Sequence, residues 1–395
     1  MMTLTATEAQ QRAGSKTPLV LGHFVNARSA NVGNGALTDG AEFLLREDLG
    51  RPLEFRREAW DDYSFGIKPF DQRFAGMING LDAMIVGGAV AMNARPHYSN
   101  AGMRFDMPRD LWSEIKKPVV FYGLSYRHWR GQTYHHADKL AWTLKYILDR
   151  YDMILGLRND GTREWLAETI GVEDERLRVV PDPGVFAIAD TSHPYHEFDP
   201  DRRLNVLLAF NDEDWEGRYN VADRRTTVIQ GLVRPIERMI EKWDANLIIV
   251  PHYFDDYRMA IDFVDRCRPQ IAHQRMIASG LAGLRGSREF YGRYVKADMV
   301  ISMRVHSMSP ALGLGTPMIP LVTQDRMTMF LDDIGLRDLA VDAFDPDMPD
   351  RLEAAIDRTL ADPDAVRRRF AAARASMRER ARAFNAEVGK LIGIG

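Results

Sequence analysis

The sequence is poor in cysteine, with Cys267 as the single one among 395 residues. One cysteine excludes a disulfide within the chain and a zinc site built from several cysteines, and it favours a reducing compartment. The chain also lacks an excess of one charge, because 52 lysines and arginines face 56 aspartates and glutamates, a formal net charge of −4. It therefore has no general electrostatic reason to bind nucleic acid.

Long hydrophobic runs are absent as well. No apolar segment approaches the roughly 20 residues that a membrane-spanning helix needs. The polar N-terminal segment lacks the charged-then-apolar pattern of a secretory signal. We expect a soluble, cytoplasmic protein, and its length allows two domains with full hydrophobic cores.

The chain does contain a regular alternation of short apolar segments and longer amphipathic ones. Several short segments are continuously apolar, as expected for strands buried on both faces of a parallel sheet. Helical patterns separate them, and the alternation predicts an α/β fold. The predicted strands lie at residues 18–24, 82–87, 118–123, 153–157, 177–180, 204–210, 246–252, 299–302 and 317–322, and the clearest helices at 36–47, 133–150, 162–170, 227–243 and 253–267.

A polar, proline-containing segment at residues 188–203 interrupts this pattern and reads as a linker. We expect an N-terminal α/β domain at residues 15–187, a C-terminal α/β domain at 204–345 and a helical segment at 346–395. From Asp362 onward, apolar residues spaced three and four apart predict one long amphipathic helix; they are Val366, Phe370, Ala373, Met377, Ala381, Phe384 and Val388. Arginines cover its other faces, which suits either a packing helix with a solvated face or contact with an anionic membrane surface or a lipid-linked acceptor.

Glycine-containing loops follow two predicted strands, and ligands of parallel sheets bind at such strand ends. Asn31, Gly33 and Asn34 belong to the segment NVGNG after the first strand, and Gly87 and Gly88 end another. The first loop would present backbone N–H groups at a helix start to an anion or polar substrate, although a tight strand-to-helix turn needs the same residues. Neither loop matches GxGxxG or GxxxxGK[ST], so a dinucleotide site or a P-loop is unsupported.

Two other strand ends carry cationic side chains. Arg158 closes the strand at 153–157, where an arginine can bind a carboxylate or phosphate through two N–H groups, or form a salt bridge within the domain. Arg304 and His306 follow the strand at 299–302, and their spacing of two through a turn can direct both toward one pocket. A histidine there can bind phosphate or deliver a proton, since its pKa lies near neutrality, or it can cap a core turn.

The remaining polar motifs are less specific. His252, Asp255 and Asp256 follow another predicted strand in PHYFDDY, but their spacing matches no metal motif. The histidine pairs at 135–136 and 193/196 favour ordinary surface roles over metal ligation. The motifs HExxH and GxSxG and a DxD-type acidic run are absent. We therefore expect neither a metal nor a bound cofactor.

Together these segments resemble the polysaccharide pyruvyl transferase family over about residues 18–340. The resemblance rests above all on ISMRVHSMSPALGLGTPMI, which is similar to the family's S-x-R-x-H-x-x-x-x-A-x-x-x-G-x-P-x-I. The N-x-G loop, the Gly-Gly strand end, LRNDGTREWL, VPDPGVF and VPHYFDD support it. The chain departs from the family at Asn34, where an aspartate is usual, and at Arg326, where a lysine is frequent; the latter change keeps the charge but not the shape.

The resemblance implies two Rossmann-like domains that face a cleft, as in GT-B glycosyltransferases, with the amphipathic helix at the C-terminus. It implies phosphoenolpyruvate as donor and hydroxyls of a saccharide, either free or lipid-linked, as acceptor. Carried over by position, Arg158, Arg304 and His306 would hold the donor's carboxylate and phosphate, with His306 and Arg158 catalytic. The expected substrate-binding set is completed by Arg326, Asn31, Gly33, Asn34, Gly88 and His252.

These residue types suit the implied reaction. Phosphoenolpyruvate carries two anionic groups on a small frame, so its pocket needs several fixed cations. A proton delivered to the methylene carbon creates a cationic centre that a sugar hydroxyl attacks; phosphate then leaves and a second hydroxyl closes a cyclic ketal. His306 could bind phosphate or act as the acid, while Asp182 or Asp255 could take the acceptor's proton. Loops at 93–108 and 211–225 are expected to select the acceptor.

Two other functions are compatible with the same fold. A GT-B glycosyltransferase would bind uridine or guanosine diphosphate rather than phosphoenolpyruvate. A non-catalytic protein that senses a phosphorylated metabolite would bind the anion without turnover. Pyruvyl transfer onto a saccharide in polysaccharide biosynthesis is the function that the sequence favours.

Overall fold

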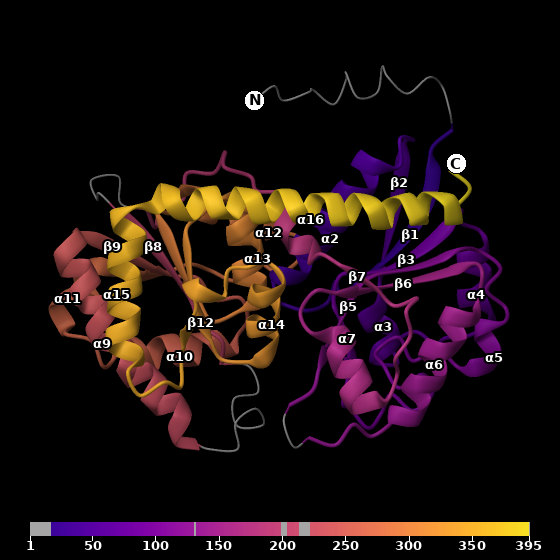
Figure 1. Cartoon of the computed structure of the whole chain (residues 1–395), viewed down its shortest axis with the longest axis horizontal. Coiled ribbons are helices and arrows are strands. Elements are labelled where there is room, and N and C mark those ends of the chain that lie inside the picture. Colours follow the sequence, from indigo (N-terminus) through magenta and orange to yellow (C-terminus); the bar gives the residue numbers. More distant parts are fainter. Residues whose placement is uncertain (1–16, 130–131, 199–203, 213–221, 395) are drawn as a thin grey trace.

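The computed structural model describes residues 17–129, 132–198, 204–212 and 222–394 (Figure 1). Two parallel sheets, each flanked by helices, lie next to each other along the long axis of the molecule, and the C-terminal helix α16 (Pro363–Leu391) runs across both. The predicted α/β fold is confirmed. Part of the expected linker, residues 199–203, lies outside the described residues.

The first sheet has the order β2-β1-β3-β5-β6-β7, and β4 also pairs with β5. Its central strands are continuous apolar runs because helices cover both faces. The edge strand β2, with the sequence LEFRREA, is mostly charged and half exposed. Its strands are β1 (Leu19–Val25), β2 (Leu53–Ala59), β3 (Ala83–Gly87), β4 (Val90–Asn93), β5 (Val119–Arg127), β6 (Met153–Arg158) and β7 (Arg178–Val180).

The helices of this half connect successive strands. They are α2 (Gly33–Asp48), α3 (Trp60–Ser64), α4 (Gln72–Asn79), α5 (Arg109–Trp112), α6 (Ala137–Asp149) and α7 (Thr162–Trp165), which continues as the π-helix η1 (Leu166–Ile170); the 3₁₀-helix η2 (Pro183–Phe186) follows β7. We call this part of the molecule, from β1 to η2, the N-terminal half.

The second sheet has the order β10-β9-β8-β11-β12-β13 and is also parallel. Its strands are β8 (Leu204–Ala209), β9 (Ala245–Ile249), β10 (Met276–Ala278), β11 (Met299–Ser302), β12 (Met318–Val322) and β13 (Val341–Asp342). Its helices are α9 (Ala222–Trp243), α10 (Asp255–Val264), α11 (Pro269–Arg275), α12 (Ser287–Lys296), α13 (Val305–Leu314), α14 (Asp325–Asp333), the 3₁₀-helix η3 (Arg337–Leu339) and α15 (Met348–Ala361). We call the part from β8 to α15 the C-terminal half.

Two glycines let one helix from each half approach the backbone of η2 closely. A Cβ atom at Gly40 of α2 would overlap the carbonyl oxygen of Pro183 in η2, and one at Gly313 of α13 would overlap the carbonyl oxygen of Val185. Helices from both halves therefore pack directly on η2. The segment VPDPGVF, which contains η2, lies at this junction.

Helix α16 confirms the predicted amphipathic pattern. Six of its seven predicted apolar residues are buried and Ala373 is partly buried. Its arginines contact groups of the protein, among them Arg378 with Asp48, Arg380 with Asp333 and Arg369 with Asp338. Arg367, Arg368 and Arg382 remain exposed on the same helix, so the hypothesis of membrane contact stays a prediction. In the described part of the chain, no helix combines the length and apolarity that crossing a bilayer requires.

Candidate active site

A cleft of about 780 Å³ lies between the two halves. Its lining residues lie in or follow β1, β2, β4 and β5 on one side and β8, β9, β11 and β12 on the other. Ligands of open parallel sheets bind at these carboxyl ends, where loops and helix N-termini present polar groups. Of the predicted site residues, the cleft wall contains Asn31, Asn34, Arg304, His306 and Arg326.

His306 lies in the first turn of α13 and is held from three sides. Its backbone carbonyl accepts a hydrogen bond from the Tyr291 hydroxyl at 2.7 Å. Nη1 of Arg158 lies 3.4 Å from its Nε2 atom. On the other side, a Cβ atom at Gly33 would overlap the Cβ and Nδ1 atoms of His306, so only glycine at the start of α2 leaves room for the ring.

The contact with Arg158 defines the state of the imidazole. A guanidinium only donates hydrogen bonds, so Nε2 must act as the acceptor and the ring proton must lie on Nδ1. Burial, together with the positive charges of Arg158, Arg326 and Arg304, holds the pKa of His306 well below its usual range. His306 is therefore a neutral imidazole at neutral pH when no anion is bound.

Arg158 ends β6 and lies behind His306, with its side chain fully buried. Its Nη2 donates to the carbonyl oxygen of Gly88 at 3.0 Å, and Nη1 lies 3.4 Å from Oδ2 of Asp182. The structure thus brings Arg158, Gly88 and His306 together, as expected. However, the guanidinium contacts the side of the imidazole that faces away from the cleft. Arg158 therefore does not line the cleft itself.

Asp182 is fully buried beneath Arg158 and accepts a hydrogen bond from the Gly184 N–H at 2.7 Å. Burial raises its pKa, opposed by the charge of Arg158. Of the two carboxylates considered as a base at the sequence level, Asp255 lines the cleft, whereas Asp182 lies in the layer behind it.

Arg304 is the N-cap residue of α13 and is fixed by two partners. Its Nε donates to the carbonyl oxygen of Phe210 at 2.9 Å, and its Nη2 pairs with Oδ1 of Asp256. The other oxygen of Asp256 accepts the backbone N–H groups of His252 and Tyr253, both at 2.9 Å. One buried carboxylate therefore positions both Arg304 and the loop after β9.

His252 is fully buried and does not reach the cleft. Its Nε2 lies 3.0 Å from the Tyr294 hydroxyl, which itself donates to Oγ of Ser307 at 2.9 Å. The ring also packs edge-on against Phe290. These contacts place His252 in the core that supports α12 and α13, away from any substrate in the cleft.

Arg326, in the first turn of α14, reaches from the C-terminal half to the N-terminal half. Its Nη1 donates to the carbonyl oxygen of Tyr126 at 2.9 Å and to Oγ of Ser125 at 3.1 Å. Oγ of Ser125 donates in turn to Asp160 at 2.6 Å, and Asp160 lies 3.9 Å from Arg326. The side chain consequently lines the cleft and links the two halves.

A chain of polar residues on the N-terminal wall was not predicted from the sequence. Asp61, which follows β2, is almost fully buried and accepts hydrogen bonds from the Arg28 N–H at 3.0 Å and from Arg104 at 3.1 Å. Asn26, with its amide oriented to satisfy both neighbours, donates to Asp61 at 2.9 Å and accepts from Asn34 at 3.2 Å. Burial raises the pKa of Asp61.

The described part of the cleft wall contains six arginines and two aspartates, Asp61 and Asp255. The arginines are Arg28, Arg95, Arg104, Arg127, Arg304 and Arg326. Such a wall attracts an anion that carries more than one charged group. Within the described residues, no group of three or more His, Cys, Asp or Glu side chains could hold a metal ion. Of the loop at 211–225, residues 213–221 lie outside the described part.

Comparison with known proteins identifies a family. The family model described as polysaccharide pyruvyl transferase matches residues 31–325 of the chain. No curated protein matches the chain.

Solved structures resemble the chain in fold. A glycosyltransferase from Rickettsia africae ESF-5 has 12% identity and a TM-score of 0.55, over 95% of this chain and 99% of that one. The S. aureus MnaA–UDP co-structure has 11% identity and a TM-score of 0.51, over 90% and 91%. The OtsA apo structure has 10% identity and a TM-score of 0.52, over 95% and 99%. With the two parallel sheets, this likeness shows a GT-B-like α/β fold.

Proposed function

Because this chain belongs to the polysaccharide pyruvyl transferase family, we propose that it transfers the pyruvyl group of phosphoenolpyruvate onto two hydroxyls of a saccharide and forms a cyclic ketal. The observation that carries this proposal is the position of His306, at the start of α13 in a cleft lined by six arginines. Phosphoenolpyruvate needs such a site, since its carboxylate and phosphate lie only a few atoms apart.

In this proposal Arg304, Arg326 and the N-terminus of α13 hold the donor. The guanidinium of Arg304 is fixed by Phe210 and Asp256, so it meets an anion with little loss of side-chain freedom. The first backbone N–H groups of a helix, with the partial positive charge at its N-terminus, add favourable interactions for phosphate. Arg158 positions His306 from behind.

The proton is the central element of the chemistry. The negative charge of bound phosphoenolpyruvate offsets the arginines and raises the pKa of His306, so that the imidazole gains a proton as the donor binds. His306 then protonates the methylene carbon, and an acceptor hydroxyl forms a bond to the carbon that carries the phosphate. The C–O bond to phosphate breaks, and the second hydroxyl closes the ketal. Asp61 and Asp255 are the candidate bases for the hydroxyl protons, because both line the cleft.

In this proposal, the donor and the acceptor bind to different halves of the protein. We assign the donor to the C-terminal half, in the domain expected at residues 204–345, which supplies Arg304, His306 and Arg326. We assign the acceptor to the N-terminal half, in the domain expected at residues 15–187, whose loops 26–34, 61–65 and 93–104 form the other wall. The acceptor is a saccharide of a polysaccharide or of its precursor.

Calorimetric titration with phosphoenolpyruvate, beside UDP and GDP, tests the donor. We expect saturable binding of phosphoenolpyruvate alone, weakened at least about tenfold in Arg304→Ala and in His306→Ala, because each loses a charged or polar contact worth about 1.5–3 kcal/mol. Arg337→Ala is the matched control, since Arg337 is exposed and donates to Thr328 outside the cleft. Binding of a nucleotide instead of phosphoenolpyruvate would favour a glycosyltransferase and contradict the proposal.

A further inference from the structure

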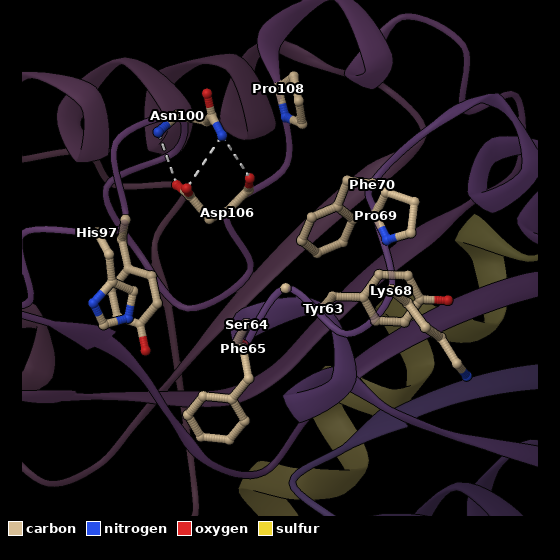
Figure 2. Close-up of a pocket in the computed structure, with 12 residues that line it drawn as sticks. Tyr63, Ser64, Phe65, Lys68, Pro69, Phe70, His97, Asn100, Asp106 and Pro108 are labelled. Atoms are coloured by element: carbon tan, nitrogen blue, oxygen red, sulfur yellow. Dashed lines mark hydrogen bonds between the residues drawn. The ribbon is translucent and has the colours of Figure 1, made fainter.

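A second cavity, of about 610 Å³, adjoins the cleft on the N-terminal half (Figure 2). It lies within the range of about 300–1,000 Å³ that is usual for ligand sites. Phe65, His97 and Tyr98 line both this cavity and the cleft. A ligand in the cavity would therefore be continuous with one in the cleft. We call this cavity the side pocket.

Aromatic rings form much of the wall of the side pocket. Tyr63 and Phe70 stack at 4.9 Å with an interplanar angle of 28°. Phe70 in turn meets Phe74 and Phe105 edge-on, at 5.0 and 5.1 Å, so these rings are anchored in the hydrophobic core. Phe65, by contrast, leaves 64% of its surface exposed. Together with the anchored rings of Tyr63 and Phe70, it gives the pocket an aromatic surface that a ligand can reach.

Polar groups lie across the pocket from some of these rings. Figure 2 shows the carboxylate of Asp106 bound to Asn100. Oδ1 of Asp106 accepts the backbone N–H groups of Asn100 and Ala101, at 2.9 and 2.7 Å, and Oδ2 accepts one bond from the Asn100 amide at 3.2 Å. A carboxylate oxygen can accept two hydrogen bonds, so Oδ2 retains capacity for a hydroxyl donor.

The side pocket differs from the cleft in charge. Lys68 is its one lysine or arginine among the described lining residues. Its ammonium already pairs with Glu58 and lies 3.4 Å from Asp62. The pocket therefore has no spare cation for a phosphate or carboxylate. It combines apolar ring faces with hydrogen-bond acceptors.

We propose that the side pocket binds a neutral sugar unit adjacent to the one that is pyruvylated, so that the acceptor is an oligosaccharide instead of a single sugar. This inference rests on the proposed function. A pyranose ring has a face of C–H groups, which packs on aromatic rings, and an edge of hydroxyls, which donate to carboxylate and amide oxygens. A phosphate group would lack a cation here, and a lipid chain would cover Asp106 without supplying a donor.

We expect occupation of the side pocket to increase the rate of pyruvyl transfer as well as the affinity for the acceptor. Binding energy from a sugar unit that does not react can position the hydroxyls of the neighbouring unit against the donor. A truncated acceptor should therefore react more slowly even when it saturates the enzyme.

The probe is an array of immobilised fragments of bacterial polysaccharides, from single sugars to trisaccharides, tested with and without phosphoenolpyruvate. We expect the wild-type protein to bind longer fragments more tightly than single sugars. Phe65→Ala should remove this gain, with binding of longer fragments about tenfold weaker, while Phe65→Trp should keep it. Ile67→Ala is the matched control, since Ile67 is 69% exposed in the same loop but does not line the pocket.

Three outcomes would overturn the inference: no preference of the wild-type protein for longer fragments, no effect of Phe65→Ala, or an equal loss in Ile67→Ala. Thermal unfolding of each variant confirms that it is folded. Calorimetry with phosphoenolpyruvate separates the two proposals. Retained donor binding without glycan preference contradicts only the side pocket, whereas glycan preference without donor binding contradicts the proposed reaction.

Discussion

At the scale of single residues, the site depends on the protonation of His306. The guanidinium of Arg158 contacts Nε2 at 3.4 Å, Arg326 and Arg304 add positive charge, and Asp160 and Asp182 face Arg158 from the other side. A neutral imidazole is the state that this arrangement favours. In the proposed mechanism, a buried arginine that does not reach the cleft therefore acts on the reaction through His306.

Arg158→Met should raise the pKa of His306 toward its ordinary value of about 6.5, because the nearest positive charge is lost. Titration of the histidine resonances by NMR in the unliganded protein measures this, with His306→Gln to assign the signal and Arg337→Met as the control. Addition of phosphoenolpyruvate should raise the same pKa in the wild-type protein. A His306 that titrates near 6.5 in the wild-type protein, and is unmoved by Arg158→Met, would contradict a positioning role for Arg158.

The sequence predicted some of these residues and missed others for physical reasons. Arg304 and His306 could be predicted because they follow an apolar strand at a spacing that directs both toward one pocket. The burial of Arg158 behind His306 could not, since it depends on packing between α13 and β6, elements far apart in the chain. Asp61 was missed because β2, which precedes it, is a charged edge strand without an apolar run.

At the scale of secondary-structure elements, the start of α2 and the start of α13 fix the shape of the site together. Gly33 touches the ring of His306, and Gly35 in the same turn approaches the side chain of Ser287 in α12. Helix α2 therefore needs two glycines where an ordinary helix would prefer alanine. The N-x-G motif thus has a steric explanation in the contact between halves, in addition to any contact with substrate.

Gly33→Ala should displace the ring of His306 and weaken the binding of phosphoenolpyruvate at least about tenfold, since a Cβ atom there overlaps Nδ1. Gly76→Ala in α4 is the matched control, because a Cβ atom at Gly76 meets nothing within 4 Å. That control should bind the donor normally and gain about 0.5–1 kcal/mol in the free energy of unfolding. Calorimetry and denaturant unfolding measure both effects. Equal donor binding by the two variants would show that Gly33 does not constrain the imidazole.

Elements with a strong periodic pattern were predicted well, and short or polar ones were not. The stripe of α16 is continuous over many turns, so its buried face could be read from the sequence. Strand β13 has two residues and β10 three, too few for a pattern. The helix predicted at 133–150 begins later, at Ala137. These differences arise because neighbouring strands, and not local preference, decide where short elements form.

At the scale of the whole molecule, a shared hydrophobic core and several polar contacts hold the halves in place. Arg326 reaches Tyr126, Asn159 donates to Asp333 at 2.6 Å, and η2 packs on helices from both halves. The sequence predicted an α/β architecture from its alternation of strands and helices. The close approaches at Gly40 and Gly313 could not be predicted, because glycine in a helix has no distinctive signal until the partner backbone is known.

Helix α16 is the longest of these connections (Figure 1). Near its C-terminal end, Phe384 packs edge-on against Tyr122 at 5.3 Å and lies against Gly156. Arg378 and Asn385 both donate to Asp48, at 2.8 and 2.7 Å. The end of the chain is thus fixed to the N-terminal sheet, although the helix begins beside the C-terminal half.

Phe384→Ala tests this connection. Because the ring is 4% exposed and fills a site between β5 and β6, its removal should cost about 3–5 kcal/mol in the free energy of unfolding. Arg368→Ala on the same helix should cost less than about 0.5 kcal/mol, since Arg368 is exposed and lies 3.9 Å from its acidic partner. Urea unfolding, followed by tryptophan fluorescence, measures both effects. Five of the seven tryptophans precede the linker, and Trp215 and Trp243 follow it, so the signal reports mainly on the N-terminal half. If Phe384→Ala unfolds at the same urea concentration as Arg368→Ala, then α16 does not stabilise the N-terminal sheet, and the halves must be held together chiefly by η2 and the contacts around the cleft.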